Sequence, residues 1–81
     1  MVMEGTITFE SQKGWWLVEA DETSELYWIH HSSVYRNRNL HRNDRVTFSV
    51  APNPMKPGYV HAVNVVWVGR LTPTGEVRHG R

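Results

Sequence analysis

Apolar and polar residues alternate with a period of two along most of this chain, and β-branched and aromatic residues gather in short runs. Alternate residues of a strand point to opposite faces, so this pattern predicts strands that bury one face. The runs lie at residues 5–9, 15–20, 26–30, 45–51 and 59–68. Helical periodicity is almost absent, and we expect an all-β fold of five strands.

The segments between these runs predict how the strands connect. Residues 11–14 and 21–25 are short and polar enough for hairpin turns, so the first three strands are expected to form an antiparallel meander. Residues 31–44 are longer and suit a crossover, with a short helical turn near residues 32–35. Residues 51–58 contain three prolines and a glycine, which predicts an exposed loop whose tip moves on ligand binding.

The chain has the size of one domain. Its 81 residues leave room for a single core, and without cysteine that core gains nothing from disulfides or thiolate-bound zinc. We expect one domain at residues 1–68 and a weakly ordered basic tail at residues 69–81. No apolar stretch reaches the roughly 20 residues that cross a bilayer, and the first residues lack the pattern of a secretory signal. We therefore expect a soluble, cytoplasmic protein that does not bind membranes.

Charge is distributed unevenly along the chain, although the formal net charge is only +1. Residues 1–30 carry one basic and six acidic side chains, whereas residues 31–81 carry eight basic and two acidic ones. The densest basic part lies in and just after the expected crossover, at Arg36, Arg38, Arg42 and Arg45. A local basic surface attracts phosphates even on a nearly neutral protein, but an arginine-rich loop can also serve solubility alone.

Aromatic side chains fall on two neighbouring predicted strands, within Lys13-Gly14-Trp15-Trp16-Leu17-Val18 and Tyr27-Trp28-Ile29-His30-His31-Ser32. Outward aromatic rings on adjacent strands are a common surface for stacking unpaired nucleic-acid bases. Alternation puts Trp15 and Leu17 on one face and Trp16 and Val18 on the other. We expect Trp16 and Trp67 to be structural, and the core to include Ile7, Val18, Ile29, Val46, Phe48 and Val65.

Fragments along the chain resemble, in order, the signature of the cold-shock domain family. Besides the two aromatic runs, they are Glu4-Gly5-Thr6-Ile7-Thr8-Phe9, Asn39-Leu40-His41-Arg42-Asn43-Asp44-Arg45-Val46-Thr47-Phe48 and Ala62-Val63-Asn64-Val65. The resemblance covers about residues 4–66. It implies a five-stranded antiparallel barrel of the oligonucleotide-binding (OB) type, which binds nucleic acid on the face of its second and third strands.

Carried over residue by residue, the resemblance assigns Lys13, Trp15 and Leu17 to the family's first ribonucleoprotein motif. It assigns Trp28, His30 and His31 to the second motif, Phe9 to one of two adjacent aromatics in the first strand, and Tyr35 to the aromatic of the long loop. Arg36 and Arg38 of the crossover are expected to contact phosphates. The expected nucleic-acid-binding residues are thus Phe9, Lys13, Trp15, Leu17, Trp28, His30, His31, Tyr35, Arg36 and Arg38.

The chain departs from the family pattern at three positions within the two aromatic runs. Trp16 stands where the family normally has a glycine, and Leu17 and His31 replace aromatic rings. Leu17 cannot stack on a base as a ring does. The indole of Trp16 occupies a position at which a glycine has no side chain, so either the barrel is locally remodelled or the strand register slips.

These features predict non-covalent binding of single-stranded RNA or DNA, of the kind found in RNA chaperones and regulators of gene expression. We expect no enzyme activity, cofactor or small-molecule substrate, because the chain has no phosphate-binding glycine loop, nucleophile elbow or acidic pair on one face. We also expect no metal site, because His30 and His31 are adjacent on a strand and would point to opposite faces.

The alternative is a protein-interaction module that keeps the fold and has lost nucleic-acid binding, since exposed tryptophans also anchor protein interfaces. The substitutions at Trp16, Leu17 and His31 favour it. So do the acidic residues around Trp15 in the sequence, which would repel phosphates unless they lie on the far rim: Glu10, Glu19, Asp21 and Glu22.

Overall fold

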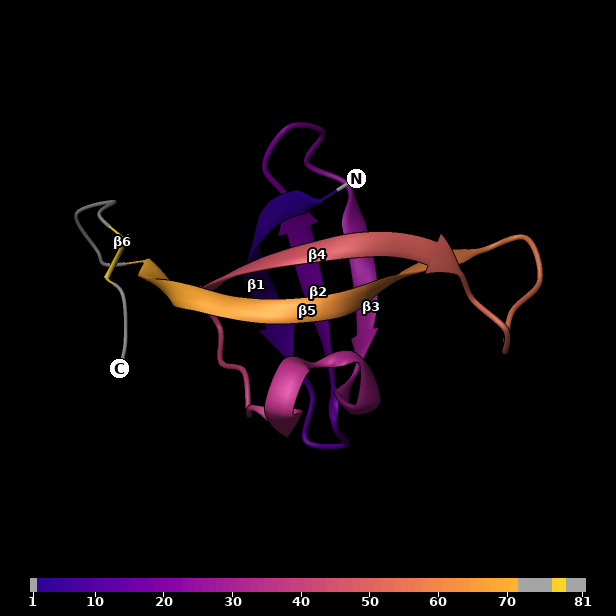
Figure 1. The fold of residues 1–81 in the computed structure, drawn as a ribbon, viewed down its shortest axis with the longest axis horizontal. Helices are drawn as coiled ribbons and strands as arrows, with labels where there is room; N and C mark the ends of the chain where they lie inside the picture. Colours follow the sequence, from indigo (N-terminus) through magenta and orange to yellow (C-terminus); the bar gives the residue numbers. More distant parts are fainter. Residues whose placement is uncertain (1, 72–76, 79–81) are drawn as a thin grey trace.

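The computed structural model describes residues 2–71 and 77–78, which form strands joined by turns and two short 3-10 helices (Figure 1). The strands are β1 (Met3–Glu10), β2 (Trp15–Ala20), β3 (Leu26–His30), β4 (Asp44–Pro52), β5 (Val60–Leu71) and β6 (Val77–Arg78), and the helices are η1 (His31–Ser33) and η2 (Tyr35–Asn37). The predicted all-β class and five strands are confirmed, and the short β6 is an addition.

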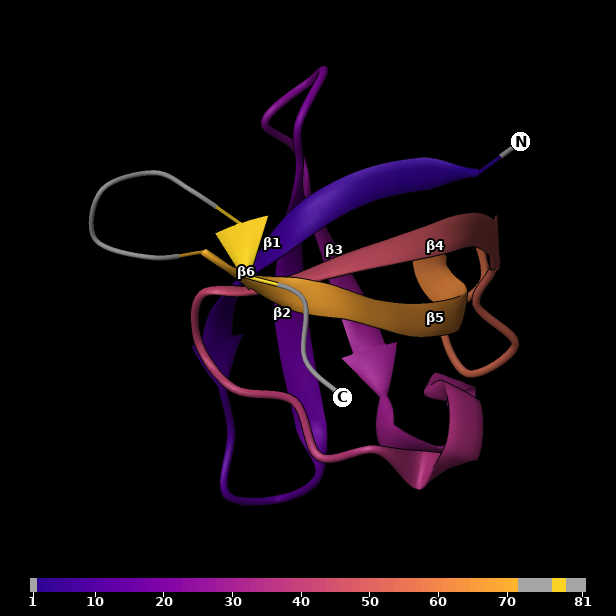
Figure 2. The same ribbon diagram turned by 60° about the vertical axis from the view of Figure 1, so that its left-hand side comes forward.

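The strands form one antiparallel sheet in the order β3-β2-β1-β4-β5-β6. The first three strands are the predicted meander, in which β2 pairs with β1 on one side and with β3 on the other. The predicted crossover is also present, because residues 31–43 carry the chain from β3 at the sheet edge to β4 beside β1. β4 and β5 run across the meander, and the two helices follow the end of β3 (Figures 1 and 2).

β5 returns toward β3, the far edge of the meander. The rings of Trp28 in β3 and His61 in β5 are nearly parallel, at 16°, with centroids 6.3 Å apart. An isolated parallel bridge also joins Val34, between the two helices, to Val65 in β5. Among the described residues no strand ladder joins β3 to β5, so the hydrogen-bonded sheet is open at this edge.

The inward positions of the strands form the core. Ile7, Val18, Ile29, Val46, Phe48 and Val65, all predicted to be core residues, are each no more than 1% exposed. Trp16, Ala20, Val34, Leu40 and Ala62 complete the same cluster, and Trp67 packs against it while remaining partly exposed. Burying one large apolar side chain contributes about 1.5–3 kcal/mol, so this cluster is the main source of stability in a chain without disulfides.

Trp16 is a core residue, as predicted, and it links β2 to the crossover. Its side chain is 4% exposed, and its indole Nε1 donates a hydrogen bond to the carbonyl oxygen of Leu40 at 2.9 Å. The register of β2 against β3 is unbroken across Trp16, whereas β1 has a bulge between Ile7 and Phe9 where it faces β2. The indole is therefore accommodated beside a local bulge, without a slip of β2 against β3.

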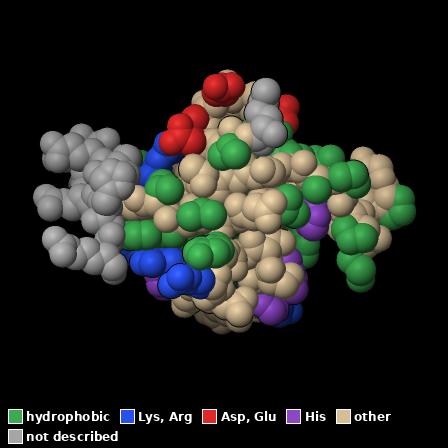
Figure 3. Space-filling view, viewed as in Figure 1, with side chains coloured by type: hydrophobic (Ala, Val, Ile, Leu, Met, Phe, Trp, Pro, Cys, Tyr) green, Lys and Arg blue, Asp and Glu red, His purple; other side chains and the backbone are tan. Residues whose placement is uncertain are grey.

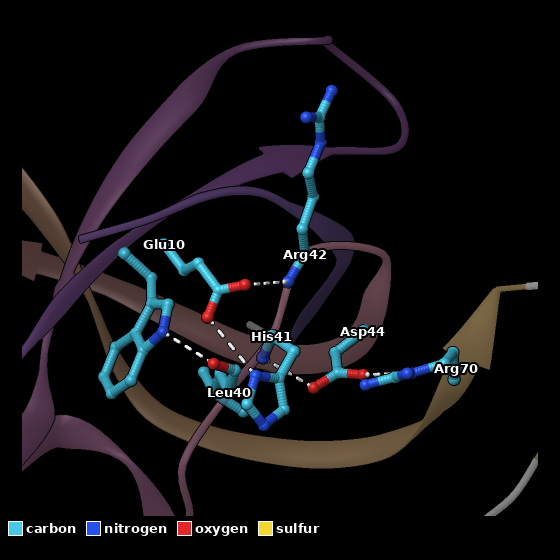
Figure 4. Close-up of polar contacts among 7 residues, drawn as sticks. Glu10, Leu40, His41, Arg42, Asp44 and Arg70 are labelled. Carbon is cyan, nitrogen blue, oxygen red and sulfur yellow. Dashed lines mark hydrogen bonds and ion pairs between the residues drawn. The ribbon is translucent and has the colours of Figure 1, made fainter. Parts of the chain in front are cut away.

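Polar contacts fix the end of the crossover where β4 begins (Figure 4). Asp44, only 2% exposed, accepts hydrogen bonds from the backbone N of His41 at 2.8 Å and from Nε of Arg70 at 3.1 Å. Glu10 at the end of β1 lies 3.2 Å from Nδ1 of His41 and accepts a longer contact from the backbone N of Arg42. These contacts tie β1, β5 and the crossover together at one point.

The fifth strand extends beyond its predicted end. β5 continues to Leu71, so the strand end expected at Val68 is wrong by three residues. The extension is explained by Arg70, which pairs with Asp44, and by the N–H of Leu71, which donates to the carbonyl of Asn43 at 2.8 Å. β6 pairs with the end of β5, and the other residues of the expected tail, 72–76 and 79–81, lie outside the described residues.

Trp16→Phe keeps an aromatic ring in the core but removes the indole N–H that Leu40 accepts. The buried carbonyl loses its donor and the smaller ring leaves space, so the free energy of unfolding should fall by about 1–3 kcal/mol. Urea unfolding followed by circular dichroism measures this change without depending on the indole that is lost. An unchanged unfolding free energy would show that the hydrogen bond to Leu40 contributes nothing to stability.

An ion pair lies at the opposite end of the meander from the Trp16 contact. Arg45 in β4 donates to both carboxylate oxygens of Asp21 at 2.6 Å, and also to Oγ1 of Thr6 at 2.9 Å. The hydrogen bonds from Arg45 lower the pKa of Asp21, and partial burial opposes this effect only in part. A carboxyl whose folded-state pKa is lowered stabilises the fold above its unfolded pKa, and this stabilisation is lost as the pH falls through the folded value.

Asp21→Asn should therefore destabilise the protein at neutral pH, but by no more than about 1 kcal/mol because the pair is partly exposed. The difference from wild type should begin to shrink below about pH 4, where the unfolded carboxyl binds a proton, and should vanish once the pH has fallen through the lowered pKa of Asp21 in the folded protein. Urea unfolding of both proteins at a series of pH values measures the difference. A difference that stays constant down to the lowest pH would mean that the charge of Asp21 does not contribute.

Candidate nucleic-acid interface

The strand register brings the predicted stacking residues of the meander onto one outward surface. Phe9, Leu17 and Trp28 are direct cross-strand partners and form one row across β1, β2 and β3. Trp15 and His30 are partners in the adjacent row. We call these residues, Phe9, Trp15, Leu17, Trp28 and His30, the aromatic face.

The bulge in β1 decides the position of Phe9. β1 pairs Ile7 with Val18 and then Phe9 with Leu17, so Thr8 is the additional residue between two consecutive partners of β2. Without the bulge, alternation would place Phe9 on the same side as Ile7. Instead Phe9 is 47% exposed and its ring centroid lies 5.3 Å from that of Trp15.

A second set of ring contacts lies on β3 and at the start of η1. The ring centroids of Trp28 and His30 are 5.6 Å apart, and those of His30 and His31 are 4.2 Å apart. The expectation that His30 and His31 lie on one strand and point to opposite faces is wrong, because β3 ends at His30 and the turn into η1 brings the two rings together. His31 is exposed and extends the aromatic face beyond the strand. The predicted residues of both motifs are thus brought together, with Leu17 as an aliphatic position between Phe9 and Trp28.

The β1–β2 turn holds this end of the aromatic face in place. Oγ of Ser11 accepts hydrogen bonds from the backbone N of Lys13 at 3.1 Å and of Trp15 at 3.2 Å. Gly14, with φ of +84°, accepts a hydrogen bond at its carbonyl from the N–H of His31 at 3.0 Å. Lys13 is exposed in this turn and is the cation that the turn presents beside Trp15.

His30 is oriented by the first turn of the crossover. Its Nδ1 accepts a hydrogen bond from the backbone N of Ser32 at 3.2 Å and lies 2.7 Å from Oγ of the same residue. With Nδ1 as an acceptor, the proton of a neutral imidazole is on Nε2. His30 therefore caps the N-terminus of η1 by accepting from Ser32, and this leaves the Nε2–H of His30 as a hydrogen-bond donor on the aromatic face.

Except for Glu10, the acidic residues of the first third gather at the opposite end of the meander from Lys13. Glu19 lies at the end of β2 opposite Leu26, and the N–H of Asp21 donates to the carbonyl of Glu4. In Figure 3 acidic side chains lie at the top, the end where Figure 1 shows the β2–β3 turn. Of the carboxylates close to Trp15 in the sequence, Glu10 is at the Lys13 end, where it contacts His41.

The remaining predicted residues, Tyr35, Arg36 and Arg38, lie on η2 and at its C-terminal end, beside β5. The guanidinium of Arg38 lies 3.7 Å from the ring centroid of Trp67, and that of Arg36 lies 5.3 Å from the ring centroid of Tyr35. Together with Val66 these side chains line a shallow cavity of about 230 Å³. Their aromatic and cationic contacts are therefore made within this group, which is distinct from the aromatic face.

Sequence reasoning missed residues that β5 and the β4–β5 loop bring next to Trp28. His61 of β5 stacks beside it, and Met55, Lys56 and Tyr59 of the loop share a pocket with it. The signal available in the sequence was the presence of a cation and an aromatic ring, Lys56 and Tyr59, close together in or beside a proline-rich loop. Their closeness to Trp28 is a property of the tertiary fold and is absent from the local pattern.

Among the described residues no group of three histidine or acidic side chains is placed to hold a metal ion, and no described helix is long and apolar enough to cross a membrane. No protein-family model matches this chain, and no curated protein matches it either. The geometry of the aromatic face is therefore the observation that bears on function.

Gly14→Ala tests how the β1–β2 turn supports His31. Alanine is strained at a φ of +84°, and its Cβ would lie 3.2 Å from Cδ2 of His31. Gly58→Ala is the matched control, because its φ is +88° and no atom lies within 4 Å of the added Cβ. We expect Gly58→Ala to lose about 1 kcal/mol of unfolding free energy in urea, and Gly14→Ala to lose clearly more. Equal losses would show that His31 yields to the methyl group at no cost.

Proposed function

We propose that this protein is an OB barrel of the cold-shock type that binds single-stranded RNA or DNA on its aromatic face. The observation that carries the proposal is the alignment of Phe9, Trp15, Trp28 and His30 in two adjacent cross-strand rows, with their rings outward. The resemblance of residues 4–66 to the cold-shock signature supports the same reading independently.

Binding is non-covalent and uses two kinds of contact. Bases stack on the rings of the aromatic face, and each stack contributes about 1–3 kcal/mol with little dependence on the base. Lys13 lies at the edge of this face and neutralises a phosphate, which adds a salt-dependent contribution without reading sequence. Nε2 of His30 supplies a hydrogen-bond donor to a base or to the backbone.

The distribution of carboxylates supports this use of the face. Glu4, Glu19, Asp21 and Glu22 lie toward the β2–β3 turn, and Asp21 is already paired with Arg45. Repulsion between charges in water weakens over roughly 10 Å at moderate salt, so carboxylates at the far rim act weakly on phosphates near Lys13. These four carboxylates are thus compatible with nucleic-acid binding at the other end, and Glu10, which lies at that end, contacts His41.

Trp28→Ala is the direct test, measured by fluorescence anisotropy of a labelled pyrimidine-rich single strand. The substitution should weaken binding by about 1–3 kcal/mol, or roughly 5- to 150-fold, because it removes one stacking surface. Leu26→Ala is the matched control, since Leu26 is on the same strand and 56% exposed but lies beside Glu19, outside the aromatic rows. It should bind as wild type does.

A duplex of the same length and a second, higher salt concentration complete this experiment. Binding should be confined to the single strand and should weaken steeply with salt. Equal affinities of Trp28→Ala and wild type would remove Trp28 from the binding surface. Absence of any single-strand binding at low salt would reject the proposal and favour the protein-interaction module, whose apolar contacts depend little on salt.

A further inference from the structure

A pocket at the edge of the aromatic face lies between β3 and the β4–β5 loop. It has a volume of about 370 Å³ and is lined by Trp28, Asn53, Met55, Lys56, Tyr59 and Val60. We call it the loop pocket. Its size falls in the range of about 300–1,000 Å³ that is usual for small-ligand sites.

The loop that forms this pocket has a defined conformation. The backbone N of Asn53 donates to the carbonyl of Tyr59 at 2.9 Å, and the N–H of Tyr59 donates to the carbonyl of Lys56 at 3.1 Å. The side-chain Oδ1 of Asn53 accepts from the N–H of Met55 at 2.9 Å. These bonds close the loop into consecutive turns and fix the backbone from which the pocket side chains extend.

The pocket is walled by large apolar side chains that remain in solvent. Met55 is 84% exposed, Tyr59 is 67% exposed and Val60 is 50% exposed. Figure 3 shows hydrophobic side chains gathered on the loop at the right of the molecule. Several adjacent exposed apolar side chains commonly mark a binding surface.

Lys56 adds a positive charge to these apolar walls. Its Nζ lies 6.0 Å from the ring centroid of Tyr59, so the ammonium group and the flat ring occupy the same part of the loop. A flat apolar wall beside a cation matches one nucleotide, whose base stacks while its phosphate meets the charge.

Trp28 connects the loop pocket to the aromatic face. It lines the pocket and is also the ring neighbour of His30. In the direction of β2, the next outward side chain after Leu17 is Glu19, whose carboxylate repels phosphates. A strand lying on Trp15 and His30 therefore has its favourable continuation across Trp28 toward Lys56.

We propose that the loop pocket is an additional nucleotide subsite, in which a base stacks against Tyr59 and its phosphate contacts Lys56. The subsite is occupied by strands long enough to cross Trp28. This inference rests on the proposed function, because the nucleotide reaches the pocket as part of a strand already bound to the aromatic face.

The test is the dependence of affinity on strand length, measured by anisotropy with labelled oligothymidylates of about 3 to about 12 nucleotides. Wild-type affinity should rise in a step at the length that reaches the pocket. Tyr59→Leu retains apolar bulk without a flat ring and should lose roughly 5-fold or more on long strands, with short strands unaffected. Tyr59→Phe is the matched control and should keep the step. Lys56→Gln should reduce the salt slope by about one unit on long strands only.

The outcomes separate this inference from the proposed function. If Tyr59→Leu and Lys56→Gln match wild type at every length while wild type binds strongly, the loop pocket is not a subsite and the aromatic face still is. If Tyr59→Leu weakens short and long strands equally, Tyr59 does not form a separate subsite, and the inference fails. If wild type binds no strand of any length at low salt, the proposed function fails and this inference fails with it.

Discussion

The hydrogen bond from the Trp16 indole to the carbonyl of Leu40 links the two halves of the fold. It joins β2, the middle strand of the meander, to a segment 24 residues further along the chain, just before β4 begins. With Trp16 committed to the interior, the alternation of β2 leaves Trp15 and Leu17 facing outward. The same contact therefore holds the crossover against the core and sets which side chains of β2 are available to a ligand.

Charge is segregated along the meander, and this segregation determines which end can face phosphates. Asp21 and its neighbours lie at the β2–β3 turn, where Arg45 compensates one carboxylate. Lys13, Trp15, His30 and His31 lie at the other end, together with the carboxylate of Glu10 that contacts His41. Arg70 pairs with the buried carboxylate of Asp44 and therefore stabilises the fold. A count of charges along the sequence does not separate residues that form ion pairs within the fold from residues that are available to a ligand, because it does not show which distant residues pair.

Features that depend on local pattern were predictable, and features that depend on contacts between distant residues were not. Alternation in Trp15-Trp16-Leu17-Val18 correctly gave the inward and outward faces, because a side chain's face follows from its position in the strand. The bulge that turns Phe9 outward is set by pairing with β2 and has no signal in the first strand itself. Likewise, β5 extends to Leu71 because Asn43 and Asp44 supply partners across the sheet.

The position of Leu17 gives the aromatic face a particular internal arrangement. Leu17 lies between Phe9 and Trp28 in the same row, so the face consists of two ring pairs, Phe9 with Trp15 and Trp28 with His30. A base above Leu17 gains apolar contact but no ring stacking. On the proposed function, a strand would thus be held mainly at two separated places, and an additional contact beyond Trp28 would matter more than on an unbroken row of rings. The loop pocket lies on that side of Trp28.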